Sequence, residues 1–336
     1  MQKAHVRNLE FCCPVNNKED AIFLDDMIDL FMGMNGGHVG KYCYDGSNWD
    51  AVIENSTKYY VPRADNELVL QASAEIRDFV PQQTPYVDFG VGGTVAFKHH
   101  VLPIINRLNS PLYVGVDFCE SALDSIASIQ RDEDQGFAVQ TVQMDFFAPN
   151  SRILTSTPSL GVMNGLTVTN KYGTLRDMNV ASDFARDLDQ LCRLTNFGWL
   201  LLTIDTNQDE TSLRDAYETP MTSRLYLNVF HRMANTLPVN DFDPSLFVYE
   251  PEWHPELHLF AHMAKATEAQ SFSLGSHHFS VKKGEKIHLL NSYKFNKDFF
   301  DSCSNKAGLR VQKIWHHETP MKLYMLAGKN ADRKMQ

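Results

Sequence analysis

The stretch YVDFGVGGTVAFKHH, from Tyr86 to His100, decides the fold. It passes from a run of apolar residues into a glycine-rich turn and then into a sequence that is compatible with a helix. Glycines directly after a strand allow the backbone to turn sharply and to approach a ligand closely. The stretch therefore predicts a nucleotide-binding turn between a strand at residues 86–91 and a helix at residues 95–108.

The spacing of the glycines narrows the choice of nucleotide. Gly90 and Gly92 match the first two glycines of the dinucleotide fingerprint G-x-G-x-x-G, but Val95 stands at the third position. The third glycine allows tight packing of the helix against the strand, so its absence argues against a nicotinamide cofactor. The turn instead has the pattern acid-x-Gly-x-Gly, with Asp88 as the acid.

Strands and helices alternate on both sides of this turn. Helices of ordinary length between the strands predict parallel pairing with right-handed crossovers, and the continuous apolar strands suit a sheet that is buried on both faces. The further strands are expected at residues 112–118, 138–146, 159–167 and 198–206, and the helices at residues 120–131 and 182–195.

Residues 207–285 break this rhythm. They contain a long helical segment, an acidic loop and stretches of alternating polarity, which we interpret as a lobe inserted into an α/β domain. The chain then returns to the sheet with a helix and two short strands, and an antiparallel pair at the end of such a sheet is typical of class I methyltransferases. We expect this Rossmann-like methyltransferase domain to comprise residues 65–206 and 295–336, and an α+β substrate-binding lobe to comprise residues 1–64 and 207–294.

Acidic residues end the second and third predicted strands. Asp117 could accept hydrogen bonds from both ribose hydroxyls, and Asp145 could bind an adenine amino group while Phe146 packs on the ring. Ligands of parallel sheets bind at the carboxyl ends of the strands, where these residues would meet. Each acid alone could equally be a helix cap or a solvated loop residue, so only the three strand ends in combination indicate a nucleotide-binding site.

Composition and charge exclude several other functions. The 336 residues carry a formal net charge of −10, whereas a nucleic-acid partner requires clustered Lys and Arg. We expect no membrane span, because no apolar run approaches about 20 residues. The six cysteines have no metal-binding or disulfide spacing, and the adjacent histidine pairs point apart, so no metal is expected. We expect a cytoplasmic protein that is a monomer or a weak homodimer.

Six motifs, in the same order, resemble those of the histidine Nα-methyltransferases of ergothioneine biosynthesis. The resemblance extends from Lys41 to Gly328 and implies S-adenosylmethionine (SAM) as the cofactor. The motifs are KYCYDGSNWDAV (41–52), KYYVPRADNELV (58–69), GLTVTN (165–170), DAYETP (215–220) with the run that follows it, ELHLFA (256–261) and NSYKF (291–295).

The resemblance implies roles for individual residues. Asn170 and Tyr217 would bind the carboxylate of an amino-acid substrate as neutral donors, and Tyr44, Tyr59 and Gly165 would surround its amino group. Tyr44 and Tyr217 are the predicted catalytic residues. The predicted cofactor-binding residues are Gly90, Gly92, Lys98, Asp117, Asp145 and Phe146, and the predicted side-chain contacts of the substrate are Leu290 and Ser292.

The chain also departs from the family pattern. Leu290 stands where the family has the glutamate that reads histidine, and Leu257 matches a family methionine. An imidazole N–H buried without a partner costs about 1–3 kcal/mol, so histidine is a poor substrate unless His288 or Asn291 replaces the lost partner. Ala96 stands where the family has a lysine after the glycine turn, and Lys98 is the expected substitute for that lysine.

These observations predict a SAM-dependent N-methyltransferase that acts on the α-amino group of a small amino acid or amino-acid-like metabolite other than histidine. Two alternatives remain open at this point. One is a non-catalytic protein that binds SAM or a metabolite with the same fold. The other is a nicotinamide-dependent reductase, which Val95 disfavours.

Overall fold

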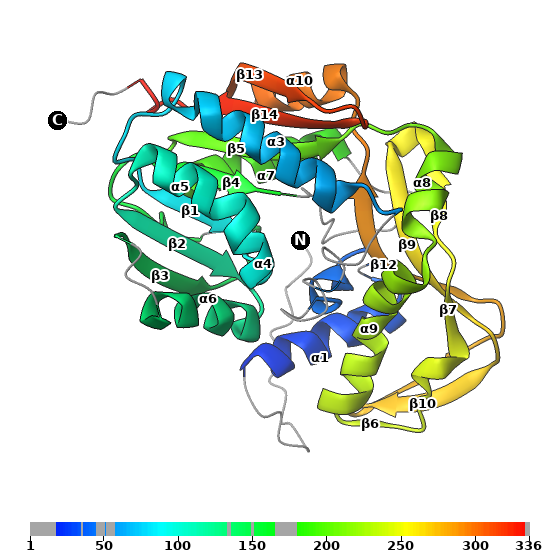
Figure 1. Cartoon of the computed structure of the whole chain (residues 1–336). Helices are drawn as coiled ribbons and strands as arrows, with labels where there is room; N and C mark the ends of the chain where they lie inside the picture. Colours follow the sequence, from blue (N-terminus) through cyan, green and yellow to red (C-terminus); the bar gives the residue numbers. More distant parts are fainter. Residues whose placement is uncertain are drawn as a thin grey trace, which may run out of the picture.

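The computed structural model describes residues 18–34, 36–44, 51, 58–132, 136–148, 151–164 and 180–332. A seven-stranded sheet with the order β13-β14-β5-β4-β1-β2-β3 forms its largest element (Figure 1). Neighbouring strands among β1 to β5 run parallel to each other, whereas β14 is antiparallel to both of its neighbours, β5 and β13. These seven strands are β1 (Tyr86–Phe89), β2 (Leu112–Asp117), β3 (Ala138–Gln143), β4 (Leu160–Met163), β5 (Trp199–Asp205), β13 (Arg310–His316) and β14 (Met321–Ala327).

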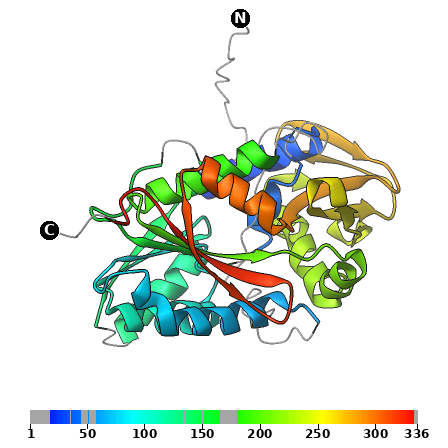
Figure 2. The same ribbon diagram turned by 90° about the horizontal axis from the view of Figure 1, so that it is seen from above.

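Helices cover both faces of this sheet. Figure 2 shows α3 and α5 on one face and α7 and α10 on the other. Because helices lie on both sides, every residue of β1, β4 and β5 is buried, as the apolar sequences of these strands predict. The α/β prediction with an antiparallel pair at the end of the sheet is confirmed. The helices that border the sheet are α3 (Val61–Glu75), α5 (Leu102–Leu108), α6 (Glu120–Asp132), α7 (Val180–Leu194) and α10 (Lys297–Lys306).

The single helix predicted at residues 95–108 has three parts. A short helix α4 (Thr94–Ala96) leads into a π-helical turn, η3 (Phe97–Val101), and then into α5. Pro103 lies at the start of α5, and its missing N–H cannot bond to the carbonyl one turn back. The wider turn accommodates this proline, and such π-turns are frequent at functional sites.

Residues 207–293 build two smaller antiparallel sheets beside the large one. One sheet has the order β11-β10-β6 and the other has the order β12-β9-β7, with β8 also paired to β9. Thr219 is the N-cap residue directly before α9, and its side chain forms a reciprocal capping pair with Thr222. The elements of this region are α8 (Glu210–Tyr217), α9 (Pro220–Thr236), β6 (Val239–Asn240), η4 (Pro244–Leu246), β7 (Phe247–Tyr249), β8 (Glu252–His254), η5 (Pro255–Leu257), β9 (Leu259–Ala266), β10 (Gln270–Leu274), β11 (His277–Val281) and β12 (Lys286–Tyr293).

The N-terminal elements pack against the smaller sheets. They are α1 (Lys18–Phe31) and the 3-10 turn η1 (Val39–Tyr42). A second 3-10 turn, η2 (Ile76–Asp78), follows α3. Phe23 of α1, Tyr86 of the large sheet and Phe230 of α9 belong to one cluster of buried apolar residues. The core is therefore continuous across the two predicted domains, and their boundaries remain a prediction.

The described part of the chain contains no helix with the length and apolar character that a bilayer span requires. The expectations of a cytoplasmic location and of a monomer or weak homodimer stay predictions.

Candidate active site

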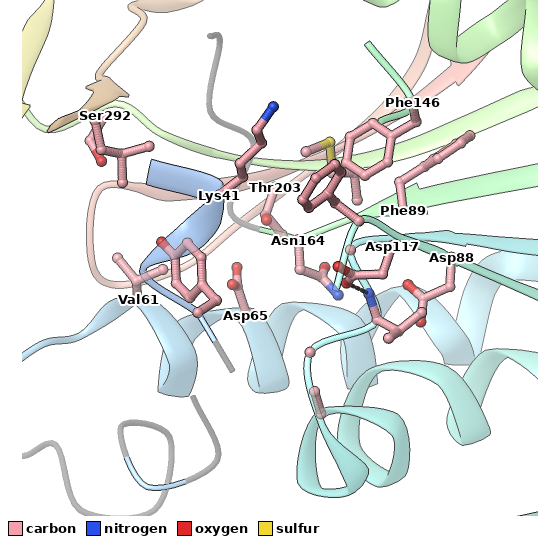
Figure 3. A pocket seen from close by; sticks show the side chains of 18 of the residues that line it. Lys41, Val61, Asp65, Asp88, Phe89, Asp117, Phe146, Asn164, Thr203 and Ser292 are labelled. Atoms are coloured by element: carbon pink, nitrogen blue, oxygen red, sulfur yellow. Dashed lines mark hydrogen bonds between the residues drawn. The ribbon is translucent and has the colours of Figure 1, made fainter. Parts of the chain in front are cut away.

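A cavity of about 250 Å³ opens where the large sheet meets the smaller ones. Its lining comes from the carboxyl ends of β1, β2, β4 and β5 on one side, and from η1, α8, α9 and β12 on the other. Figure 3 shows part of this lining, including Lys41, Asp117 and Ser292. The position agrees with the rule that parallel sheets bind ligands at the carboxyl ends of their strands.

The glycine turn forms one wall of the cavity. Gly90 and Gly92 have φ values of 83° and 62°, a region that side chains with a Cβ rarely adopt. The Gly90 N–H donates to the carbonyl of Val116, 2.8 Å away, which ties the turn to β2. A Cβ at Gly90 would meet no atom within 4 Å, so the space beside this turn is open to a ligand.

The two predicted strand-end acids are held by nearby backbone groups. Asp117 accepts hydrogen bonds from the N–H groups of Val91 (3.0 Å) and Cys119 (2.9 Å), and burial raises the pKa of its carboxyl group. Asp145 accepts a hydrogen bond from the N–H of Phe147 at 3.0 Å. Both acids line the cavity, as does Phe146.

Aromatic side chains and one leucine form the opposite wall. The residues Tyr44, Tyr59, Tyr217, Leu290 and Ser292 all line the cavity, and the roles that the motifs imply for them stay predictions. The rings of Tyr59 and Tyr217 meet edge to face, with centroids 5.0 Å apart. Burial raises the pKa of both phenols, so they are neutral hydrogen-bonding groups.

Two predicted substrate residues, Gly165 and Asn170, lie outside the described residues. Their assignment therefore stays a prediction.

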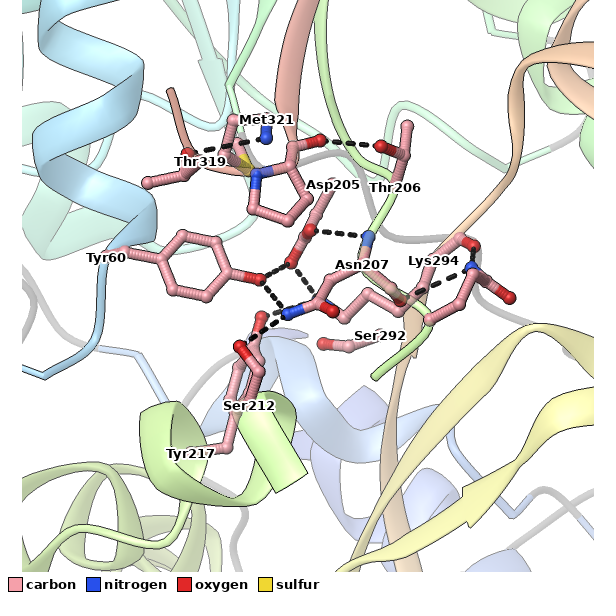
Figure 4. A network of polar contacts seen from close by, with 12 residues as sticks. Tyr60, Asp205, Thr206, Asn207, Ser212, Tyr217, Ser292, Lys294, Thr319 and Met321 are labelled. Atoms are coloured by element: carbon pink, nitrogen blue, oxygen red, sulfur yellow. Dashed lines mark hydrogen bonds and ion pairs between the residues drawn. The ribbon is translucent and has the colours of Figure 1, made fainter. Parts of the chain in front are cut away.

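A buried ion pair supports Tyr217. The Nζ atom of Lys294 lies 2.8 Å from Asp205 Oδ2 and 2.7 Å from the hydroxyl oxygen of Tyr217. The Tyr60 hydroxyl donates to the same Asp205 oxygen at 2.6 Å, and Asn207 donates to Tyr60 at 3.1 Å (Figure 4). Lys294 is only 2 % exposed, so this network is a fixed part of the wall rather than a surface contact.

A second chain of contacts holds Ser292. The buried ring of His262 bridges the hydroxyls of Tyr249 (2.6 Å) and Ser292 (2.8 Å). Burial, followed by the charge of Lys294, holds the pKa of His262 well below its usual value, so the imidazole is neutral. A neutral ring has one N–H and one acceptor nitrogen, which suits a bridge between two hydroxyls.

Comparison with known proteins identifies the family. The family model described as "Histidine-specific methyltransferase, SAM-dependent" matches residues 39–327. The chain belongs to this family. It is therefore a SAM-dependent methyltransferase, and the nicotinamide and non-catalytic alternatives are set aside.

Three curated relatives are similar over parts of the chain. The "Uncharacterized protein y4iF" of Sinorhizobium fredii is 26% identical over 66% of this chain and 73% of its own length. The "N-methyltransferase imqF" of Aspergillus flavus is 27% identical over 35% of this chain and 33% of its own length. The "N-methyltransferase fsqC" of Aspergillus fumigatus is 28% identical over 34% of this chain and 32% of its own length. The matches with the fungal proteins thus span about a third of each partner.

The residues around the glycine turn of this methyltransferase fit SAM. The open space beside Gly90 can accept the nucleoside, and the Asp117 carboxylate keeps lone pairs for ribose hydroxyls beyond its two backbone bonds. Phe146 offers an apolar surface for the adenine ring next to Asp145. Bound SAM would supply the electrophilic methyl group.

Lys98 does not take part in this wall. It is exposed on the outer side of η3 and is not among the residues that line the cavity. His100 of the same turn does line it, is 6 % exposed, and its Nε2 atom has no hydrogen-bond partner among the described residues. Burial lowers the pKa of His100 to about 4, so its ring is a neutral candidate for binding the cofactor carboxylate. The widened turn places residue 100, rather than 98, on the inner side.

The match of Leu257 to a family methionine stays a prediction. Leu257 lies in η5 and does not line the cavity. The residue paired with Leu290 across the sheet is His262, five positions later. Neither Leu257 nor His262 is among the described residues that line the cavity.

The sequence motifs also left Lys41 without a role. Its Nζ atom lies 2.9 Å from Asp26 and 3.8 Å from Asp145, at the cofactor side of the cavity. Lys41 is the first residue of the KYCYDGSNWDAV motif, so this motif was the sequence feature that could have pointed to it.

Among the described residues, no cluster of His, Cys, Asp or Glu could hold a metal ion.

Proposed function

We propose that this methyltransferase transfers a methyl group from SAM to the α-amino nitrogen of a small amino acid or amino-acid-like metabolite, and that the substrate is not histidine. The names of the two fungal relatives support nitrogen as the acceptor atom. The polar groups of Tyr59, Tyr217 and Ser292, set among aromatic rings, suit a molecule with one polar end and one apolar end.

One observation carries the substrate proposal: the side chain at position 290 is an alkyl group inside the cavity. Leu290 is 3 % exposed and packs on the backbone of Gly40, because a Cβ at Gly40 would come within 2.1 Å of its Cδ1 atom. An imidazole N–H that faced Leu290 would lose its partner, at a cost of about 1–3 kcal/mol. An apolar or aromatic side chain would lose nothing there and would gain contacts with Tyr44 and Tyr226.

The residues act by orientation in this proposal. A well-oriented amine gains about 7–11 kcal/mol of barrier reduction from proximity alone. Tyr217 would donate to the substrate carboxylate, since its own oxygen is held by Lys294 and its pKa is raised by burial. Tyr44 and Tyr59 would flank the amino group and keep bulk water away.

A substrate panel tests the proposal. The purified protein is incubated with SAM and each proteinogenic amino acid in turn, and mass spectrometry follows the gain of one methyl group. We expect methylated products from aromatic or aliphatic amino acids and little from histidine. Histidine as the best substrate, or methylation at a side-chain atom, would overturn the proposal. Binding of S-adenosylhomocysteine (SAH), measured by calorimetry, confirms that the protein tested is competent.

A further inference from the structure

Two buried oxygen atoms face the cavity without a hydrogen-bond donor. They are Oδ1 of Asp65, on α3, and Oδ1 of Asn164, directly after β4, and neither has a partner among the described residues. Both residues line the cavity, and Figure 3 shows their side chains entering it from neighbouring elements. Asp65 as a whole is only 3 % exposed.

Buried acceptors without donors are costly, so such a pair is complementary to a ligand with several N–H groups. We propose that Asp65 and Asn164 hold the amino group of the substrate and that Asp65 accepts the proton which this group must lose before methylation. This inference rests on the proposed N-methylation and names the residues that make it possible. An ammonium ion has no lone pair, so a proton acceptor is required at this position.

The groups around Asp65 place it at the substrate end of the cavity. The Thr203 hydroxyl of β5 hydrogen-bonds to its carboxylate, and the charged groups that act on it are those of Asp205 and Lys294. The Tyr59 phenol, just before α3, also feels its charge. Asp205 and Lys294 belong to the wall that holds Tyr217.

Among the described residues, His100 of η3, an element packed on α3, also lines this cavity, and its ring is neutral near pH 7. The phenols of Tyr44, Tyr59 and Tyr217 have pKa values raised by burial, so they are poor proton acceptors. Burial raises the pKa of Asp65 to about 8, which is the range in which a general base for an amine works best.

The ionised Asp65 carboxylate takes one proton from the substrate ammonium and becomes a carboxylic acid, while the Asn164 oxygen accepts another N–H and fixes the lone pair. The lone pair forms the new N–C bond as the C–S bond of the sulfonium breaks, and the electron pair of that bond stays on sulfur. Asp65 returns its proton to water when the products leave.

The variant Asp65→Asn tests the role of the carboxylate, with Glu67→Gln as the matched control. Glu67 is an exposed acid on the same helix and lies outside the cavity. We expect kcat/KM of the wild type to rise with pH up to about 8, following the Asp65 carboxyl. In the Asp65→Asn variant, we expect kcat/KM to show no such rise with pH and the rate at pH 7 to fall by about 10²–10⁴-fold. The control Glu67→Gln should change neither the pH profile nor the rate.

A binding measurement provides a readout that does not depend on turnover. Calorimetry of the best substrate with the SAH complex, in two buffers of different ionisation enthalpy, counts the protons released on binding. Near pH 7 the wild type should release close to one proton, because Asp65 ionises when the ammonium docks, and Asp65→Asn should release none. Asn164→Ala should weaken substrate binding without removing the proton release.

The outcomes separate this inference from the proposed function. An Asp65→Asn enzyme that keeps the pH profile and the proton release refutes the role of Asp65. If Asp65→Asn loses more than tenfold in SAH affinity with an unchanged KM for the amino acid, the carboxylate serves the cofactor's amino group and the inference is wrong. If the wild type binds SAH but methylates no amine, the proposed function itself fails.

Discussion

The two walls of the cavity are built in different ways. On the cofactor side, Asp117 and Asp145 are held by backbone N–H groups of residues two positions away, and by Val91 of the neighbouring turn. On the substrate side, Tyr217, Lys294 and Asp205 hold one another through side chains that are 77 and 89 positions apart in sequence. The cofactor wall is thus a set of independent local structures, whereas the substrate wall is a single cooperative network.

This difference predicts how each wall responds to mutation. The loss of one cofactor residue should affect binding of SAM and little else. The loss of one network residue should affect the stability of the whole protein, because a buried polar group then has no partner.

The largest expected effect is that of Lys294→Met. The Asp205 carboxylate would stay buried without its cation, and such a loss costs about 3–5 kcal/mol of unfolding free energy. Chemical denaturation followed by circular dichroism measures it. The exposed Lys297→Met is the control and should leave the midpoint unchanged. The double variant Lys294→Met/Asp205→Asn should recover part of the loss. Equal midpoints for Lys294→Met and the wild type would show that the network is not cooperative.

The second effect is that of Asp117→Ala on cofactor affinity. The removal of charge-assisted hydrogen bonds to ribose should cost about 1.5–3 kcal/mol, which corresponds to roughly 10- to 100-fold in the Kd for SAH. Isothermal titration measures the Kd, and Asp124→Ala, on the exposed face of α6, serves as control. An unchanged Kd would remove Asp117 from the nucleoside site. A large loss of stability would instead show that the bonds of Asp117 to Val91 and Cys119 are its main contribution.

A gain of function is expected from Leu290→Glu. A carboxylate at this position could accept the imidazole N–H, so histidine should bind about tenfold more tightly than to the wild type. The free variant should melt at a lower temperature, because the new charge is buried beside Gly40, and histidine should restore part of the loss. Leu290→Met changes only the shape and should bring no gain. If neither variant changes the affinity for histidine, position 290 does not face the substrate side chain.

The smallest effects concern the turn η3. His100→Ala should weaken SAH binding by about fivefold, the value of one neutral hydrogen bond, whereas Lys98→Ala should change it by less than about twofold. Titration of both variants under the same conditions compares them. A larger effect of Lys98→Ala than of His100→Ala would show that the lysine reaches the cofactor after all.

The local motifs predicted the parts of the site that depend on short-range geometry. Gly90 and Gly92 favour a turn at this position. Asp117 ends β2, Asp145 follows the end of β3 by two residues, and the carboxyl ends of these two parallel strands lie at one edge of the sheet. The family resemblance pointed to the aromatic side chains of the opposite wall, because these residues lie within motifs that match the family.

The sequence by itself determined the alternation of strands and helices, the glycine turn and the acids beside it, since these follow from residue spacing and backbone preference. Only the tertiary structure decided that His100 rather than Lys98 faces the cavity, that Lys294 is buried against Asp205, and that His262 pairs with Leu290 across the sheet. The physical reason is that burial and strand register arise from contacts between segments far apart in the chain. No pattern within one segment contains them.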